Sequence, residues 1–318
     1  MSESVLFTTQ KNEGPFLVEW LAFHRLIGFD RAVIVSNDCS DGSDELLDAL
    51  AATMPLTHLR QEVANGENAQ ESGQSVARAA GTFSRGDWVA WLDPDEFLNS
   101  HVGDGRLPAL IDRVAPAEAI VMNWRLFGSS GVRRWPGLQL DPRFDRCGTA
   151  FHKSARYCKT LFRYGPHIEV MHMHRPQLTA EHAASGEVFW RDSEGEPLPQ
   201  EYVVGRRGSG GPHFRTPRRP NYDWVQVNHY MVRTWPLYRL RQSRGRGARV
   251  GTTDQRRGRR YTFAHYQKHN CNVLRDRSIH RHLPALHAEM RRLLSDRRVA
   301  AAHRASLAAN GISDRTEG

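Results

Sequence analysis

The stretch WVAWLDPDEFLNS, residues 88–100, decides the fold of this chain. Its apolar run, Trp88 to Leu92, ends abruptly in three acidic residues. These are Asp93, Asp95 and Glu96. A short apolar run without polar alternation is typical of a strand that is buried on both faces of a parallel sheet. Ligands of open α/β sheets bind at the carboxyl ends of the strands, so the stretch predicts a buried strand that ends in a functional site.

Three neighbouring carboxylates repel one another, and a divalent cation relieves that repulsion. The spacing of Asp93 and Asp95 therefore predicts a Mn²⁺ or Mg²⁺ site that holds a phosphorylated ligand. On this reasoning, Asp95→Asn should leave the fold intact and even stabilise it slightly, because it removes one charge from the cluster. The alternative is a polar turn in which Asp95 or Glu96 caps the next helix. A metal-dependent phosphoesterase would also use carboxylates, but it would need a richer His/Asp set near residue 93.

Composition limits the class of protein. The chain has 318 residues, of which 39% are hydrophobic and 25% charged, so it can bury a large core. No run approaches 18 apolar residues, and residues 1–14 lack the features of a secretory signal. The cysteines lie without metal-ligand spacing, which predicts reduced thiols in the cytoplasm. They are Cys39, Cys147, Cys158 and Cys271.

The formal net charge is +9, and its excess is concentrated in an arginine run over residues 239–260. Only Asp254 opposes the run, whose arginines are Arg239, Arg241, Arg244, Arg246, Arg249, Arg256, Arg257, Arg259 and Arg260. Such a field favours nucleic acid, anionic lipid headgroups or a nucleotide diphosphate. It supports a second hypothesis, a polyanion- or nucleic-acid-binding protein without catalysis. A solvated basic loop is the alternative.

In the first hundred residues, segments with the hydrophobic pattern of a strand alternate with segments that have the pattern of a helix. Strands are predicted at 4–9, 32–36, 55–62 and 88–92, and helices at 13–28, 44–52 and 70–83. This rhythm predicts a parallel sheet flanked by helices. Further on, we expect a helix at 107–114, strands at 119–124 and 167–174, and loops over 127–165. A long loop or flexible insertion is predicted at 185–221, and helices from Tyr222 onward.

Several motifs occur in an order that resembles glycosyltransferases of the GT-A fold, closest to the family 2-like and family 92 group. The motifs are KNEGPFLVEWLAFHRLIGFD (11–30), SNDCSDGS (36–43), WLDPDEFLN (91–99), NWRLFGSSG (123–131), KTLFR (159–163) and VNHYMVRTWPLYRLRQSRG (227–245). Together they span most of residues 5–245, and RDRSIHRHLP (275–284) is similar to the end of such proteins.

The resemblance implies a Rossmann-like, mostly parallel sheet with a largely helical C-terminal extension. It implies a glycosyltransferase domain at 1–245, with a donor half at about 1–100 and an acceptor half at about 101–245. A basic loop and helical extension would follow at 246–318. The implied reaction is a metal-dependent, inverting transfer of a hexose from a nucleotide-sugar, of the UDP class, to a hydroxyl of a saccharide or lipid-linked acceptor. The expected setting is polysaccharide biosynthesis in the cytoplasm, with peripheral contact to an anionic inner membrane face and no dedicated nucleic acid.

The resemblance also assigns roles to individual residues. The implied donor-binding residues are Asn37, Asp38, Asp41, Arg78, Asp93, Arg241 and Arg244. The implied metal ligands are Asp93 and Asp95, to which the imidazole of His229 would add a third. Trp124, Arg125 and Phe127 follow a predicted strand, and they are therefore the candidates for binding the acceptor. Asp95 and Glu96 would be catalytic. The structural alternatives are an Asx-rich turn and helix cap for 37–43, a surface site for Arg78, and core positions for Trp124, Phe127 and His229.

Inversion needs a general base, and the sequence leaves its identity open. The candidates are Glu96, Asp145, His167 and Glu169. His172 and His174 would share a face of a strand, where a solvent-facing position is favoured over a metal pair.

The last expectation concerns a lid. Arg233, Leu237, Arg241 and Arg244 recur at a spacing of three and four residues, so on one helix they would share a face. We expect this face to close over the donor diphosphate.

Overall fold

The computed structural model of the chain describes residues 2–64, 67–205, 214–244 and 261–312, without the side chains of residues 242–244. The arginines of the run beyond residue 244 therefore lie outside the described residues.

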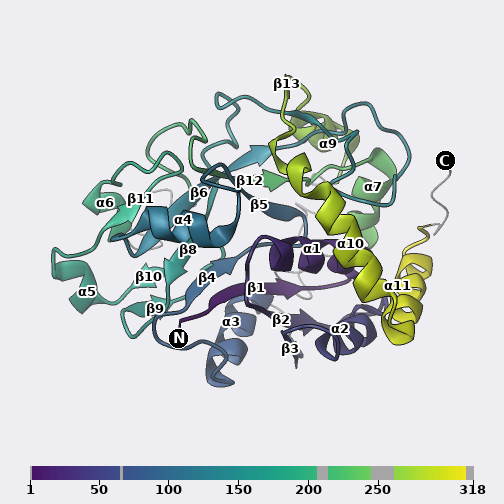
Figure 1. Cartoon of the computed structure of the whole chain (residues 1–318), viewed down its shortest axis with the longest axis horizontal. Coiled ribbons are helices and arrows are strands. Elements are labelled where there is room, and N and C mark those ends of the chain that lie inside the picture. Colours follow the sequence, from purple (N-terminus) through teal and green to yellow (C-terminus); the bar gives the residue numbers. More distant parts are fainter. Residues whose placement is uncertain (1, 65–66, 206–213, 245–260, 313–318) are drawn as a thin grey trace.

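One mixed, mostly parallel sheet forms the centre of the molecule (Figure 1). Among the described residues it has nine strands, in the order β3-β2-β1-β4-β8-β6-β12-β5, with β11 beside β6. Their bounds are β1 Ser4–Gln10, β2 Arg31–Asn37, β3 Leu56–Gln61, β4 Trp88–Trp91, β5 Glu96–Ser100, β6 Ala119–Leu126, β8 Cys158–Arg163, β11 Trp190–Arg191 and β12 Val225–His229. Strands β3, β2, β1 and β4 are parallel, whereas β8 and β5 run antiparallel to their neighbours. The predicted α/β class is confirmed.

Two short ribbons lie outside this sheet. Strand β7 (Arg146–Cys147) pairs with β13 (Leu274–Arg275), and β9 (Ile168–Val170) pairs with β10 (Gln177–Leu178).

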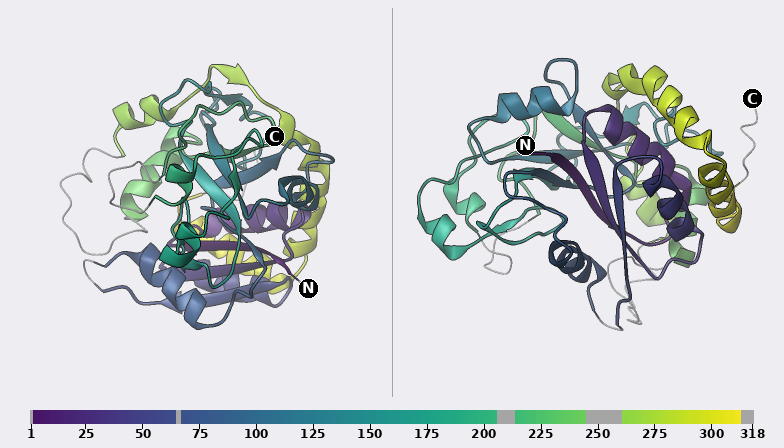
Figure 2. Two further views of the ribbon diagram at one scale, coloured as in Figure 1. Left: turned by 90° about the vertical axis from the view of Figure 1, so that its left-hand side faces the viewer. Right: turned by 60° about the horizontal axis from the view of Figure 1, so that its bottom comes forward.

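Helices cover the two faces of the sheet unequally (Figure 2). One face carries α1 (Gly14–Leu26), α2 (Ser43–Ala51), α4 (Leu107–Val114), α10 (Leu283–Leu294) and α11 (Arg297–Ala309). The other face carries α3 (Ala69–Ala79) and the segment with β9 and β10. The alternation of β1 shows why, because Leu6 joins the first core while Val5 and Phe7 join the second. The remaining helices are α5 (Ala180–Ala184), α6 (Gln200–Val203), α7 (Trp235–Arg244), α9 (Phe263–His269) and the 3₁₀ helix η1 (Ser278–His282).

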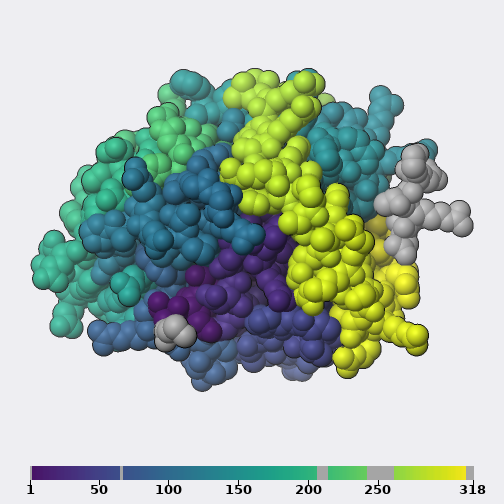
Figure 3. All heavy atoms as spheres, viewed as in Figure 1, coloured from purple at the N-terminus to yellow at the C-terminus, as the bar shows by residue number. Residues whose placement is uncertain are grey.

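The C-terminal helices lie across the N-terminal part of the chain, as Figure 3 shows from the outside. Helix α10 packs on α1, and α11 packs on α2. Asn310 at the end of α11 donates a hydrogen bond to Asp41, 3.0 Å away. The helical extension predicted from the sequence therefore packs directly against the half predicted to bind the donor.

Three strands depart from the sequence expectations. We predicted loops over 127–165 and helices from Tyr222, but β8 and β12 occupy these segments, and β5 was not expected. Each carries fully buried polar side chains, such as Lys159 on β8 and Asn228 on β12. These residues interrupt the apolar pattern by which buried strands are found. The strand predicted at 167–174 is reduced to the three residues of β9.

Within the part of the chain that the structure describes, no helix is both long and apolar enough to cross a bilayer.

Candidate active site

The carboxyl ends of four parallel strands meet at one edge of the sheet. Asn37 ends β2, Asp93 follows β4, Trp124 lies near the end of β6, and His229 ends β12. Strand β1 lies between β2 and β4, where the direction in which strands are added reverses, and ligands of open α/β sheets bind at such points. The antiparallel register of β12 and β5 places His229 opposite Glu96. Residues far apart in the sequence thus gather around the predicted acidic cluster.

A buried lysine neutralises two of the three acids. Lys159 on β8 is fully buried, and its Nζ lies 3.2 Å from Asp93 Oδ2 and 3.0 Å from Glu96 Oε2. The backbone N–H of Asp93 donates to the same Glu96 oxygen over 2.8 Å. Burial lowers the pKa of Lys159, but the charges of Asp93 and Glu96 outweigh it and raise this pKa. Burial raises the pKa of Glu96 to about 7, against the opposing effect of Lys159.

Asp95, the third acid, is neutralised by another set of cations. It is buried, and Arg241 of α7 forms an ion pair with its Oδ2. His229 Nε2 lies 3.5 Å from the same oxygen. Burial alone would raise the pKa of Asp95, but the charge of Arg241 and the interaction with His229 hold it well below its usual range.

These ion pairs change one expectation from the sequence. Repulsion among the acids suggested that Asp95→Asn would stabilise the fold slightly. The cluster is already compensated by Lys159 and Arg241, so this substitution would leave a buried guanidinium without its anion. We now expect it to destabilise the protein. One hint was visible beforehand, since a lysine precedes the apolar residues of KTLFR.

The donor atoms around Asp95 suit a divalent cation. Asp93 and Asp95 offer carboxylate oxygens, which Mg²⁺ and Mn²⁺ prefer, and His229 offers an imidazole nitrogen. Nδ1 of His229 is buried and has no hydrogen-bond partner among the described residues. The side chain of Asp93 remains 25% exposed, so this carboxylate can be reached from solvent. The residues present therefore offer the donor types of the metal that the sequence predicted, although their ligand atoms are more widely spaced than in a closed three-ligand site.

A second network supports the turn at Pro94. Gln139 donates from Nε2 to the Pro94 carbonyl over 3.0 Å and accepts from Arg233 Nε over 2.8 Å. Glu19 of α1 accepts the backbone N–H groups of Gln139 and Leu140, each over 2.7 Å. Burial raises the pKa of Glu19 to about 7, although these two hydrogen bonds oppose the rise. Neither Glu19 nor Gln139 could be predicted from the sequence, because their link to Pro94 is formed only in the folded chain.

Aromatic side chains line the flank of the acidic cluster. The ring of Trp124 stacks on Tyr157 with centroids 5.2 Å apart, and lies 4.4 Å from the ring of His229. Tyr157 in turn stacks on Phe214 at 5.2 Å. His174 lies 5.6 Å from Trp124, between ring centroids. Such a group of rings can receive the apolar face of a sugar. Tyr157 and Phe214 were missed, since no periodic pattern marks them.

The other two predicted acceptor residues have different neighbours. Arg125 forms an ion pair with Asp276 at 3.0 Å, and Phe127 is buried against the ring of Tyr230 at 4.7 Å. These contacts favour a structural role for Arg125 and the core alternative for Phe127.

The turn after β2 divides into two parts. Asn37 is 1% exposed, and neither its amide oxygen nor its amide nitrogen has a hydrogen-bond partner among the described residues. Asp38 has a left-handed φ of 46° and lies 3.7 Å from Lys11. Asp41 accepts the backbone N–H groups of Ser43 and Gly14 at 3.0 and 3.3 Å. These bonds favour the Asx-turn alternative for Asp41, whereas Asn37 has unused hydrogen-bonding groups beside β1.

Several predicted residues lie outside this group. Arg78 is in the last turn of α3 and donates to the carbonyls of Glu169 and Ile168 at 2.7 and 3.2 Å. Asp145 pairs with Arg277 at 2.9 Å.

His167 and Glu169 lie beyond the end of β8, at the opposite edge of the sheet. The structure therefore does not bring Arg78, Asp145, His167 or Glu169 to the acids. His172 lies just beyond β9, within the same segment.

The predicted lid is a helix, but with a different arrangement. Helix α7 begins at Trp235, and Arg233 precedes it with a left-handed φ of 47°, so the expected common face is wrong for Arg233. Leu237 is buried against Phe16 and Leu307. The anion opposite Arg241 is Asp95 itself. The side chain of Arg244 lies outside the described residues.

Comparison with known proteins identifies the family. The sequence profile described as Glycosyl transferase family 2 matches residues 7–174, more than half of the chain. The chain belongs to glycosyl transferase family 2. The match includes β4, the three acids and Lys159.

Individual proteins that are similar to this chain match it over a smaller part than the family profile does. A glycosyltransferase family 92 protein of Ricinus communis is 27% identical over 139 residues, which cover 42% of this chain and 24% of that protein. A family 92 protein of Oryza sativa subsp. japonica is 29% identical over 92 residues, 29% of this chain and 15% of that protein. The chain thus matches about a quarter of these relatives' length or less. The crystal structure of S. aureus TarS overlaps 51% of this chain and 28% of that chain at 16% identity, with a TM-score of 0.32, too low to support an argument.

Proposed function

We propose that this chain transfers a sugar from a nucleotide-sugar of the UDP class to a hydroxyl group of a saccharide or lipid-linked acceptor. The observation that carries the proposal is the edge of the sheet where Asn37, Asp93 and Asp95 gather. Strands β2 and β4 flank β1, so Asn37 and Asp93 lie about 10 Å apart across the sheet. That span suits a nucleoside at β2 and its diphosphate at β4.

Asp93, Asp95 and His229 would hold the divalent cation, which would neutralise charge that develops on the leaving diphosphate. Because Arg241 and His229 hold the pKa of Asp95 well below its usual range, this carboxylate stays ionised and can serve as a ligand. Arg241 lies beside Asp95, so it can add charge-assisted hydrogen bonds to the same phosphates. Lys159 and Glu96 lie one layer deeper and act as positioning residues, since both are fully buried.

The acceptor would bind against Trp124, Tyr157 and Phe214. Trp124 lies next to His229 and hence next to the cation ligands, and Tyr157 and Phe214 stack outward from it in turn. His174 is the base we favour for the acceptor hydroxyl. Its Nδ1–H donates to the Cys158 carbonyl over 2.8 Å, which orients the ring beside Trp124. Inversion, a hexose donor and a place at the inner face of an anionic membrane complete the proposal.

Polyanion binding without catalysis is the less favoured candidate. Arg241 belongs to the arginine run, yet its guanidinium forms an ion pair with the buried Asp95. It is therefore not part of an open basic surface. The acids themselves would serve no purpose in such a protein.

Thermal unfolding tests the proposal directly. UDP together with Mn²⁺ should raise the melting temperature more than the sum of the two separate effects, because metal and diphosphate bind as a unit. Asp95→Asn should abolish this joint effect, whereas Asp112→Asn, at an exposed position on α4, should preserve it. The absence of any joint effect, for UDP and for the other nucleoside diphosphates with Mn²⁺ or Mg²⁺, would overturn the proposal.

A further inference from the structure

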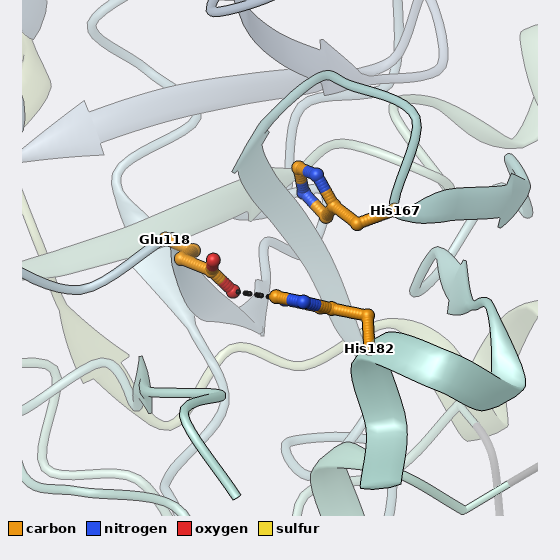
Figure 4. Close-up of side chains that lie close together, drawn as sticks. All are labelled: Glu118, His167 and His182. Carbon is orange, nitrogen blue, oxygen red and sulfur yellow. Dashed lines mark hydrogen bonds and ion pairs between the residues drawn. The ribbon is translucent and has the colours of Figure 1, made fainter. Parts of the chain in front are cut away.

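Three metal-ligating side chains converge at the edge of the sheet opposite the acids. Glu118 precedes β6, His167 lies between β8 and β9, and His182 belongs to α5. All three are half-buried, and one ligand atom of each lies within 4.8 Å of the others. Figure 4 shows the carboxylate and the two imidazole rings around a common space. Among the described residues, no other three His, Cys, Asp or Glu side chains come this close.

We propose that Glu118, His167 and His182 bind one Zn²⁺ ion, which fastens residues 164–187 to the central sheet. Two imidazoles and one carboxylate are a common set of three protein ligands for zinc, with water in the fourth position. Bonds of 2.0–2.2 Å place tetrahedral ligands about 3.4 Å apart. His182 Nε2 and Glu118 Oε2 already lie 3.0 Å apart, so only a small closure of the His167 ring is needed.

Each ligand is oriented by groups around it. Nε2 of His167 meets the Arg163 carbonyl at 3.1 Å, and since a carbonyl only accepts, Nε2 carries the proton and Nδ1 keeps its lone pair. A second-shell bond of this kind is typical of metal-bound histidines. Gly165 leaves room beside this nitrogen, because a Cβ there would lie 2.9 Å from Nδ1.

Backbone hydrogen bonds hold the three segments together. The N–H of Thr179 donates to the His167 carbonyl over 2.9 Å, and the Thr179 side chain caps α5 through the N–H of His182 at 3.3 Å. The N–H of Arg163 donates to the Glu118 carbonyl over 2.8 Å. The ligands are therefore presented by a preformed frame, which reduces the entropy that binding would have to overcome.

Helix α5 is the element that a bound ion would hold against the sheet. It has five residues and buries none of them fully, so the apolar packing to which the partly buried Ala183 contributes holds it only weakly. Its described link to the sheet is the contact of His182 with Glu118. An ion shared by these residues would anchor the helix and the adjoining β9–β10 ribbon.

This site is distinct from the catalytic cation. Arg163 at the end of β8 pairs with Trp88, and Asp93 lies five residues further along, so the two edges are about 16 Å apart. The proposal thus stands independently of the proposed glycosyltransferase activity.

Metal analysis of the full, tag-free chain tests the proposal. After EDTA treatment and reconstitution with Zn²⁺, the protein should retain about one zinc per chain and melt several degrees higher than its EDTA-treated form. Co²⁺ in place of Zn²⁺ should give the intense visible absorption of a tetrahedral site. His167→Ala and His182→Ala should weaken zinc binding at least tenfold, and so should Glu118→Gln, which keeps the side-chain shape if a histidine variant fails to fold.

The controls separate this site from the catalytic one. Asp95→Asn and His287→Ala, the latter on α10, should keep the zinc. Zinc content and melting temperature that are equal in the parent protein and in the Glu118→Gln variant would overturn the proposal, leaving only an ion pair between Glu118 and His182. Zinc retained by all three ligand variants would show an adventitious ion only.

Discussion

The two edges of the sheet handle charge in opposite ways. At the edge that ends β4, three acids are compensated by Lys159 and Arg241, which the chain itself supplies. At the other edge, Glu118 faces two imidazoles that carry no fixed positive charge. A buried carboxylate needs a partner, so internal cations make the first site stable before any ligand binds. On our proposal, an added ion would serve this purpose at the second site, where Glu118 is half-buried.

The largest effect is expected at Lys159, the internal cation of the edge that ends β4. Lys159→Met should lower the free energy of unfolding by about 3–5 kcal/mol, because it leaves Asp93 and Glu96 as neighbouring acids without their buried cation. Urea denaturation measures the change. The exposed Lys268→Met is the matched control. Lys159→Met with Glu96→Gln should recover part of the loss, and a loss below about 1 kcal/mol for the single variant would mean that the ion pairs do not support the fold.

The next largest effect is expected at Asp95. Asp95→Asn should reduce sugar transfer by about two to three orders of magnitude, because a ligand of the charge-stabilising cation is lost. It should also destabilise the fold at neutral pH.

The stability change has a defined pH dependence. The folded pKa of Asp95 is depressed, so its contribution is present above the unfolded value of about 4 and is lost as pH falls through the folded value. The stability gap between the parent protein and Asp95→Asn should therefore close in acid. Turnover close to that of Asp112→Asn would show that the site is elsewhere.

Glu19 extends the comparison to a third case. It is a buried acid whose hydrogen-bond partners are mainly backbone N–H groups and not a charged side chain or an ion. Its folded pKa of about 7 exceeds the unfolded value, so the folded state binds the extra proton and stability falls as pH rises from about 4.5 to 7. Glu19→Gln should remove this component, so its stability relative to the parent protein should improve by about 2–3 kcal/mol between pH 5 and pH 8. Chemical denaturation across this range, with the exposed Glu45→Gln as control, gives the measurement; parallel pH curves would refute the prediction.

The smallest effect is expected beside the acids, at the aromatic flank. Trp124→Leu should raise the KM for the acceptor about five- to tenfold, since it removes one stacking ring worth about 1 kcal/mol. Initial rates at varied acceptor concentration, with the exposed Phe263→Leu as control, would detect this. An unchanged KM would mean that Trp124 takes no part in acceptor binding and has only a structural role.

The half of the fold that follows hydrophobic periodicity could be read from the sequence. Strands β1 to β4 and the helices between them match the predicted segments within a few residues, and α4 matches at both ends. Strands β8 and β12 were hidden, because Lys159, Gln226 and Asn228 are buried polar residues whose partners come from other elements. For the same reason the acids were predicted but Lys159 was not, and Arg241 was predicted to bind the donor and not to pair with Asp95.

The position of β12 has a consequence for synthesis of the protein. This strand inserts between β6 and β5, and among the described residues it is the only sheet partner of β5. Until His229 has left the ribosome, β5 and β6 each expose an open edge, and the acids lack both the histidine and Arg241. Open edges invite pairing with other chains, so the nascent protein is most vulnerable to aggregation in this interval. A chain truncated before β12 would hold all the acidic residues of the site and still be unable to assemble it.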